Sequence, residues 1–167
     1  MSEVMRADVT TQVIVIEQLA ALVRDNRAGA VVVFSGDVRT HDGGKEVLSL
    51  TYEIHPTAHE QIAFITTALL NGRDVVKVAL SHRYGEIAIG ETAFGVAVSA
   101  EHREAAFETC SALVDEIKAK LPIWKHQRFT DGSDEWVNTA ELTTSKTWKH
   151  IDNTSIMYNK ILIMYSH

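Results

Sequence analysis

The feature that most constrains the fold of this chain is a long apolar stripe with helical spacing, which ends at Pro122. Its members recur every three or four residues and so share one face of a helix: Ala106, Cys110, Leu113 and Ile117. Because proline cannot continue a helix, the pattern predicts a helix over residues 101–120. A helix with one apolar side must bury that side against another layer of structure. The stripe also favours a core position for Cys110 over a nucleophilic one.

Strand patterns alternate with helical patterns along the rest of the chain. Further helices are expected at 13–23 and 56–70, and strands at 30–35, 48–54, 75–81, 92–98, 125–129 and 135–138. The last two strands are expected to pair as a hairpin across residues 130–133. Strands that alternate with two long helices predict an α+β fold with a mixed sheet.

Two of these strands have informative burial patterns. Residues 30–35 form a compact, mostly β-branched run, which is typical of a strand buried on both faces. Residues 48–54 alternate between apolar and polar, so we expect one buried face that consists of Leu48, Leu50, Tyr52 and Ile54. The glycine-rich residues 41–44 are expected to form a loop, and residues 84–91 a pair of turns.

The length and the hydrophobic content suit one domain. With 167 residues, 46% of them hydrophobic, the chain can bury a core of its own. That domain is expected to span residues 1–140. Residues 141–167 differ in character, being rich in Ser, Thr, Asn and Lys before a short apolar end. We interpret this tail as an added element, a partner-binding arm or a poorly ordered end.

Composition argues against several classes of protein. No apolar run approaches the roughly 18 residues that cross a bilayer, and the N-terminus lacks the pattern of a secretory signal. A single cysteine excludes an intrachain disulfide and a multi-cysteine zinc site. The formal net charge of −6 argues against general nucleic-acid binding, which depends on neutralising phosphates. We expect a soluble, cytoplasmic protein that binds neither membranes nor nucleic acids.

Basic residues nevertheless gather in one segment of this acidic chain. Five lie within eleven residues: Lys118, Lys120, Lys125, His126 and Arg128. In one interpretation Lys118 and Lys120 stay in solvent, where they favour the negative end of the helix dipole. In the other, Pro122 and Trp124 direct Lys125 back towards Lys118, and each ammonium group lowers the pKa of the other. A neutral lysine can accept a proton or act as a nucleophile, and a charged one stabilises developing negative charge.

Other candidate residues lie at the ends of expected elements. Arg39 follows the buried strand, a common place for side chains that contact ligands. His102 and Arg103 open the long helix, where free backbone N–H groups favour an anion and a guanidinium can bind phosphate or carboxylate. His55 and His59 have a spacing that a metal could use, but no third ligand is placed near them, so no metal site is expected.

Five segments in order resemble the large, catalytic subunit of molybdopterin synthase. They are G-A-V-V-V-F-S-G-D-V-R (29–39), L-T-Y-E-I-H-P (50–56), H-R-Y-G-E-I-A-I-G-E (82–91), V-S-A-E-H-R-E-A-A-F-E (98–108) and I-K-A-K-L-P-I-W-K (117–125), followed by Trp136-Val137. The resemblance spans residues 7–140, and five motifs in the same order and spacing make it specific. The sequence departs from the family at Asp37, where relatives can carry a basic or neutral residue.

The resemblance implies a fold, a reaction and a set of site residues. The implied fold is an α/β hammerhead with an extra antiparallel sheet, dimeric at the centre of a heterotetramer. The implied substrate is cyclic pyranopterin monophosphate, which receives two sulfurs as a dithiolene without any other cofactor. Sulfur arrives as a thiocarboxylate on the C-terminal glycine of a small ubiquitin-like subunit. The implied residues are Lys118 and Lys125 for catalysis and Arg39, His102 and Arg103 for substrate, and we add Asp37, Val38 and His126 to the substrate-binding set.

The length of the expected helix limits how these residues can meet. Arg103 and Lys118 are fifteen residues apart, which is roughly 22 Å at ~1.5 Å per residue. One small pterin cannot be held by both ends of such a rod. We therefore expect each pocket to take its lysines from one chain and His102 and Arg103 from the dimer mate.

Two alternative functions compete with sulfur transfer. The first is a non-catalytic α+β module that binds an anionic metabolite or the acidic tail of a partner. The second is a metal-dependent hydrolase that uses His55, His59 and His82.

Overall fold

A computed structural model of the protein describes residues 1–138 and 159–164, which form three helices and ten strands. The helices are α1 (Ile16–Leu22), α2 (Ala58–Leu70) and α3 (Arg103–Lys120). The strands are β1 (Glu3–Thr10), β2 (Ala30–Asp37), β3 (His41–Asp42), β4 (Lys45–Ile54), β5 (Lys77–Arg83), β6 (Gly85–Ile87), β7 (Thr92–Ala100), β8 (Ile123–Phe129), β9 (Asp134–Asn138) and β10 (Asn159–Met164). Among the helices of these residues, none combines the length and apolar composition that crossing a bilayer requires.

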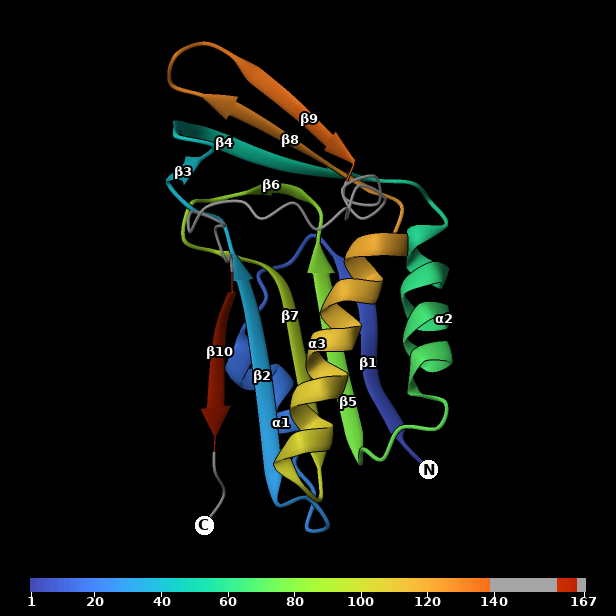
Figure 1. Cartoon of the computed structure of the whole chain (residues 1–167). Coiled ribbons are helices and arrows are strands. Elements are labelled where there is room, and N and C mark those ends of the chain that lie inside the picture. The colour runs from blue at the N-terminus through green and yellow to red at the C-terminus, as the bar shows by residue number, and fades with distance from the viewer. Residues whose placement is uncertain (139–158, 165–167) are drawn as a thin grey trace, which may run out of the picture.

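The strands form two sheets. The first has the order β1-β5-β7-β2-β10 and is mixed, since β1 is parallel to β5 while the other neighbours are antiparallel. The second has the order β3-β4-β8-β9, with β6 also paired to β4, and is antiparallel. It lies across one end of the first sheet (Figure 1). The predicted α+β class with a mixed sheet is therefore confirmed.

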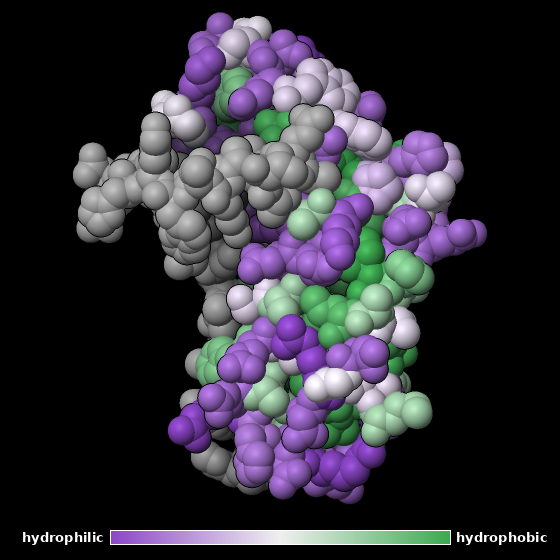
Figure 2. Space-filling view, turned by 45° about the vertical axis from the view of Figure 1, so that its right-hand side comes forward, coloured by the Kyte–Doolittle hydropathy of each residue, from purple (hydrophilic) through white to green (hydrophobic). Residues whose placement is uncertain are grey.

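Helices cover both faces of the first sheet. The long helices α2 and α3 bury one face together with Val32 and Phe34, and the short helix α1 buries the other together with Val31 and Val33. Successive residues of β2 thus enter two different cores, as expected for a strand buried on both faces. On the outer side, hydrophilic residues cover much of the described surface, with a hydrophobic band among them (Figure 2).

The prediction of which β4 side chains are buried is wrong at one position. Leu48 is 58% exposed, whereas the neighbouring Val47 is buried. The pairing of β4 with β8 shifts between Val47 and Ser49, so an extra residue is inserted into β4 at this point. Such a bulge reverses the side-chain alternation on one side of the irregularity, and a strict two-residue period cannot predict it.

Two predicted loops contain strands. Residues 41–44 are not an open loop, because His41 pairs with Glu46 and Asp42 pairs with Lys45 in a tight hairpin. The two turn residues have positive φ angles, 55° at Gly43 and 79° at Gly44, which glycine adopts without strain. Within residues 84–91, Gly85–Ile87 forms β6 and pairs with β4.

Both ends of the chain add strands to the first sheet. Sequence patterns did not indicate β1, which pairs in parallel with β5, because its polar and apolar residues do not alternate strictly. At the other end, residues 159–164 of the predicted tail form β10, which pairs antiparallel with β2. Residues 141–158 and 165–167 lie outside the described residues.

Gly29 lies where the entry to β2 meets the start of α3, and its lack of a side chain has a steric reason. A Cβ at this position would lie 2.7 Å from the backbone oxygen of Glu101. Because that neighbour is backbone, it cannot rotate away, so we expect Gly29→Ala to lower the free energy of unfolding by about 1–3 kcal/mol. Urea denaturation followed by circular dichroism measures the change. An unfolding midpoint equal to that of the wild type would show that the two segments can separate freely.

Candidate functional site

The junction between α3 and β8 places two lysines in the interior of the molecule. The helix ends just before Pro122, and β8 begins at Ile123 and runs beside β4. Lys125 faces Tyr52 of β4 in the strand register. On the last turn of α3, the Lys118 ammonium group lies over the Phe34 ring, 5.7 Å from its centroid, in a cation–π contact.

The environment of Lys118 lowers its pKa. Burial is the largest cause, because it penalises the charged form, and the positive charge of Lys125 acts in the same direction. Asp115, one turn earlier on α3, opposes both. Lys125 is thus close enough to influence Lys118, as the sequence hypothesis required. A lysine with a lowered pKa has a larger neutral fraction near neutral pH, which suits proton transfer or nucleophilic attack.

Arg39 joins this group through an acidic residue. The Lys125 ammonium donates a hydrogen bond of 2.9 Å to Oδ2 of Asp42, and Oδ1 of the same carboxylate lies 3.5 Å from Nη2 of Arg39. All three side chains are at most about one-third exposed. The fold therefore brings together the end of β2, the hairpin β3–β4 and strand β8.

An aromatic cluster lies beside the lysines, with His82 at its centre. The His82 imidazole stacks on Phe94 at 5.1 Å and meets Tyr52 edge-on at 5.0 Å. Phe94 in turn contacts Phe34, whose ring lies beneath the Lys118 ammonium group. The Nδ1–H of His82 donates to the backbone oxygen of Arg83, which can only accept. Sequence reasoning considered His82 only as a metal ligand, although it opens one of the matched motifs.

Burial keeps His82 neutral. It lowers the pKa of His82 to about 4, and the nearby positive charge of Lys118 contributes in the same direction, against the hydrogen bond to Arg83. Near neutral pH, His82 therefore adds no positive charge to those of Lys118 and Lys125.

The other basic residues of the 118–128 segment do not join this site. Lys120 is exposed and pairs with Glu116 on the outer side of α3. Side chains alternate along β8, so His126 and Arg128 point away from the face that carries Lys125. His126 instead stacks on Trp136 at 4.1 Å and lies 2.9 Å from the Asp134 carboxylate.

Asp37 and Val38, which precede Arg39, are engaged within the protein. The Asp37 carboxylate accepts hydrogen bonds from the hydroxyl groups of Ser35 and Thr92, at 2.5 and 2.9 Å. The Val38 side chain is buried, and its backbone bonds with Glu91 and Gly90. These contacts hold the chain in place just before Arg39.

His102 and Arg103 lie at the opposite end of α3 from Lys118. Both are exposed, and His102 is only 3.6 Å from the Glu101 carboxylate. With 18 residues, α3 is about 27 Å long at ~1.5 Å per residue. One chain therefore does not bring this pair to the lysines.

The three histidines that a metal-dependent hydrolase would use as ligands lie in separate environments. His55 Nδ1 is 2.8 Å from the Thr57 hydroxyl, His59 meets the Tyr84 ring edge-on, and His82 is buried in the aromatic cluster. In the part of the chain that the structure describes, no group of three or more His, Cys, Asp or Glu residues is arranged to hold a metal ion.

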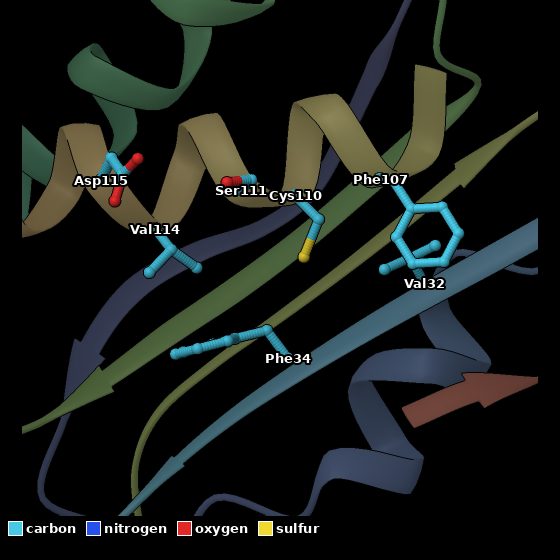
Figure 3. Close-up of a pocket in the computed structure, with 7 residues that line it drawn as sticks. All are labelled: Val32, Phe34, Phe107, Cys110, Ser111, Val114 and Asp115. Atoms are coloured by element: carbon cyan, nitrogen blue, oxygen red, sulfur yellow. The ribbon is translucent and has the colours of Figure 1, made fainter. Parts of the chain in front are cut away.

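A pocket of about 90 Å³ lies between β2 and α3 (Figure 3). Its lining combines residues from these two elements: Val32, Phe34, Phe107, Cys110, Ser111, Val114 and Asp115. Phe34 lines this largely apolar pocket and also contacts the Lys118 ammonium group, so the pocket adjoins the lysine site. Burial raises the pKa of Cys110 to about 12, which leaves it an unreactive thiol, as the apolar stripe predicted.

Comparison with known proteins gives the family. The sequence model of the family described as MoaE protein matches residues 9–120, well over half of the chain. This chain belongs to the MoaE family. Curated members named molybdopterin synthase catalytic subunit include one from Pyrococcus abyssi, 37% identical over 73% of this chain and 82% of that protein. Another, from Arabidopsis thaliana, is 40% identical over 69% of this chain but only 58% of its own length.

Solved structures agree with this assignment. Molybdopterin synthase from Staphylococcus aureus superposes with a TM-score of 0.71 at 29% identity, over 78% of this chain and 96% of that one. A complex of subunits 1 and 2 of the molybdopterin-converting factor from Helicobacter pylori shares the fold, with a TM-score of 0.58 at 18% identity, over 89% of this chain and 92% of that one. The resemblance inferred from the five motifs is thus confirmed at the level of family, fold and enzyme class.

The neutral state of His82 can be tested through stability. Its folded pKa of about 4 lies below the unfolded value of 6.5, so the unfolded chain binds the extra proton as the pH falls between these values. This group should therefore cost the native state about 2 kcal/mol between pH 7 and pH 4.5. Urea titrations at pH 7 and at pH 4.5 measure how much free energy of unfolding each protein loses on acidification. We expect the loss in His82→Gln to be smaller than the loss in the wild type by about 2 kcal/mol. Equal losses in the two proteins would contradict a neutral, buried His82.

Proposed function

We propose that this chain acts as the catalytic subunit of a molybdopterin synthase, which transfers sulfur from the C-terminal thiocarboxylate of a small ubiquitin-like partner to cyclic pyranopterin monophosphate. The product is the dithiolene of molybdopterin. The observation that carries the proposal is the partly buried Lys118, whose pKa is lowered by burial and by the charge of Lys125, together with the Asp42 carboxylate that links Lys125 to Arg39. Family membership and the names of the curated relatives support the reaction class.

Each basic residue has a role that suits its environment. Arg39 offers a planar fork that can bind the cyclic phosphate through two hydrogen bonds. Lys118, the partly desolvated amine, lies nearest the incoming thiocarboxylate. It accepts and returns protons there, and in its charged form it stabilises the negative charge that develops on the acyl oxygen when water replaces sulfur and leaves a carboxylate on the small subunit. Lys125 binds substrate and tunes the pKa of Lys118 through its charge.

The site is completed by a second copy of the chain. Because α3 separates His102 and Arg103 from Lys118 by most of its length, the pair from the dimer mate supplies these contacts to the pterin and phosphate. The small subunits bind at the two outer ends of the dimer and give a heterotetramer. In a twofold dimer both pockets are composite in the same way.

The role of Lys118 predicts the effect of one substitution. We expect Lys118→Ala to reduce dithiolene formation by at least ~10²-fold, since general acid–base groups contribute factors of this size. The control is Lys120→Ala, two residues along α3, because Lys120 is exposed and paired with Glu116. The assay mixes each variant with the thiocarboxylated small subunit and cyclic pyranopterin monophosphate and follows sulfur uptake by mass spectrometry.

Two results of this assay would contradict the proposal. Normal turnover in Lys118→Ala would remove Lys118 from the mechanism. Binding of the pterin by the wild-type chain without its conversion would indicate a non-catalytic binding module.

The composite pocket predicts complementation between inactive variants. A dimer of one Lys118→Ala chain and one Arg103→Ala chain has one pocket with both defects and one intact pocket. We expect the two inactive proteins, unfolded together and refolded as a mixture, to recover about a quarter of wild-type activity, since half of the dimers are mixed. Each protein refolded alone is the control. If the refolded mixture remains as inactive as its components, one chain supplies all of these residues to its own pocket.

A further inference from the structure

A carboxylate occupies the space between two cations of the proposed substrate site. The two oxygens of Asp42 divide between these cations: Oδ2 accepts from Lys125 at 2.9 Å, and Oδ1 lies 3.5 Å from Arg39. The Asp42 side chain is only 18% exposed and that of Lys125 only 15%. An oxyanion held by a guanidinium and an ammonium group is the arrangement that a substrate phosphate would require here.

The Asp42 carboxylate lies directly before an open turn of the chain. Asp42 is the last residue of the two-residue strand β3, directly before the turn at Gly43 and Gly44. A Cβ built on either glycine meets no atom of the described chain within 4 Å, so the space around the turn itself is open. The residue after the turn is held in place by the loop between β8 and β9. Arg39 and Lys125, by contrast, extend from the end of β2 and from the interior of the second sheet.

We propose that Asp42 is an internal competitor for the substrate anion, which occupies the cationic site until a phosphate displaces it. This inference rests on the proposed function, because it takes Arg39 and Lys125 to be the groups that bind the phosphate. On displacement, the Asp42 side chain rotates away from Arg39 and Lys125, and the two cations turn to the incoming group. No covalent bond changes in this step.

The exchange makes Asp42 a residue that determines specificity. A ligand without a negative group cannot replace Asp42. If it left the ion pairs intact, it would gain no contact with the two cations, and if it broke them, the cations would lose their partner at a cost in free energy. The cyclic phosphate of the substrate replaces one singly charged oxyanion with another that also has two terminal oxygens, so both cations keep an anionic partner. The site therefore selects phosphorylated pterins over unphosphorylated ones. Chloride and small carboxylates, which have no pterin to add further contacts, compete poorly with the tethered Asp42 carboxylate.

The test measures binding of cyclic pyranopterin monophosphate by titration calorimetry, without the small subunit. Removing the competing charge with Asp42→Asn should tighten binding by about three- to tenfold, since the ligand no longer has to break an ion pair. Asp42→Glu keeps a carboxylate within reach and should bind like the wild type. Glu116→Gln is the matched control, because it removes the same charge from an exposed pair near the end of α3 and should leave binding unchanged.

The outcomes separate this inference from the function on which it rests. If Lys125→Ala weakens binding while Asp42→Asn leaves it unchanged or weaker, the site binds the substrate, but Asp42 supports Lys125 and does not compete. If the wild-type chain shows no binding, or Lys125→Ala binds as well as the wild type, the proposed function and the competitor fail together. If Glu116→Gln tightened binding as much as Asp42→Asn does, the change in affinity would come from the net charge of the protein and not from competition by Asp42.

A structural measurement supplies a second criterion. In the wild type, the amide NMR signals of Gly43 and Gly44 should shift when cyclic pyranopterin monophosphate is added, because the adjacent Asp42 carboxylate leaves its ion pairs. In Asp42→Asn these signals should already lie near the shifted position before the ligand is added. Signals that stay fixed in the wild type at saturating ligand would overturn the displacement of Asp42.

Discussion

The partial burial of the Lys118 ammonium group is the interaction on which the rest of the site depends. Burying a charge is unfavourable, and the protein offsets this cost through the face of Phe34 beneath the ammonium group and the Asp115 carboxylate one turn away. A neutral His82 avoids a further repulsion. The result is an amine whose pKa is lower than that of an exposed lysine, at the end of a helix packed against the core.

This arrangement needs both sheets. The first sheet supplies the aromatic floor through β2, β5 and β7, and the second brings Lys125 and Asp42 above it through β8 and the β3–β4 hairpin. Tyr52 links the two layers, since it pairs with Lys125 in the strand register and contacts His82 edge-on. A change that shifted the second sheet would therefore alter the charge around Lys118 without touching that residue. The Asp42 carboxylate extends the same principle, because it pairs with Lys125 of the second sheet and with Arg39 at the end of β2.

Several features of the site could be predicted from local sequence, and others could not. The apolar stripe of α3, its end at Pro122 and the return of Lys125 towards Lys118 all follow from short-range patterns, and the structure agrees with them. His126 is equally basic and adjacent to Lys125, yet it faces the other side of β8, because strand alternation separates neighbours. Asp42 gave no signal at all in a glycine-rich segment, since its importance comes from Arg39 and Lys125, which are distant from each other in sequence.

The sequence by itself determined the fold class, the family and the positions of the two lysines, because periodicity and motif spacing are properties of neighbouring residues. The tertiary structure decided which charges meet. It buried Lys118 over Phe34, left Lys120 in solvent, placed Asp42 between two cations and kept His102 and Arg103 at the far end of α3. The physical reason is that desolvation and ion pairing depend on distances through space, and only the packing of the two sheets and α3 sets those distances.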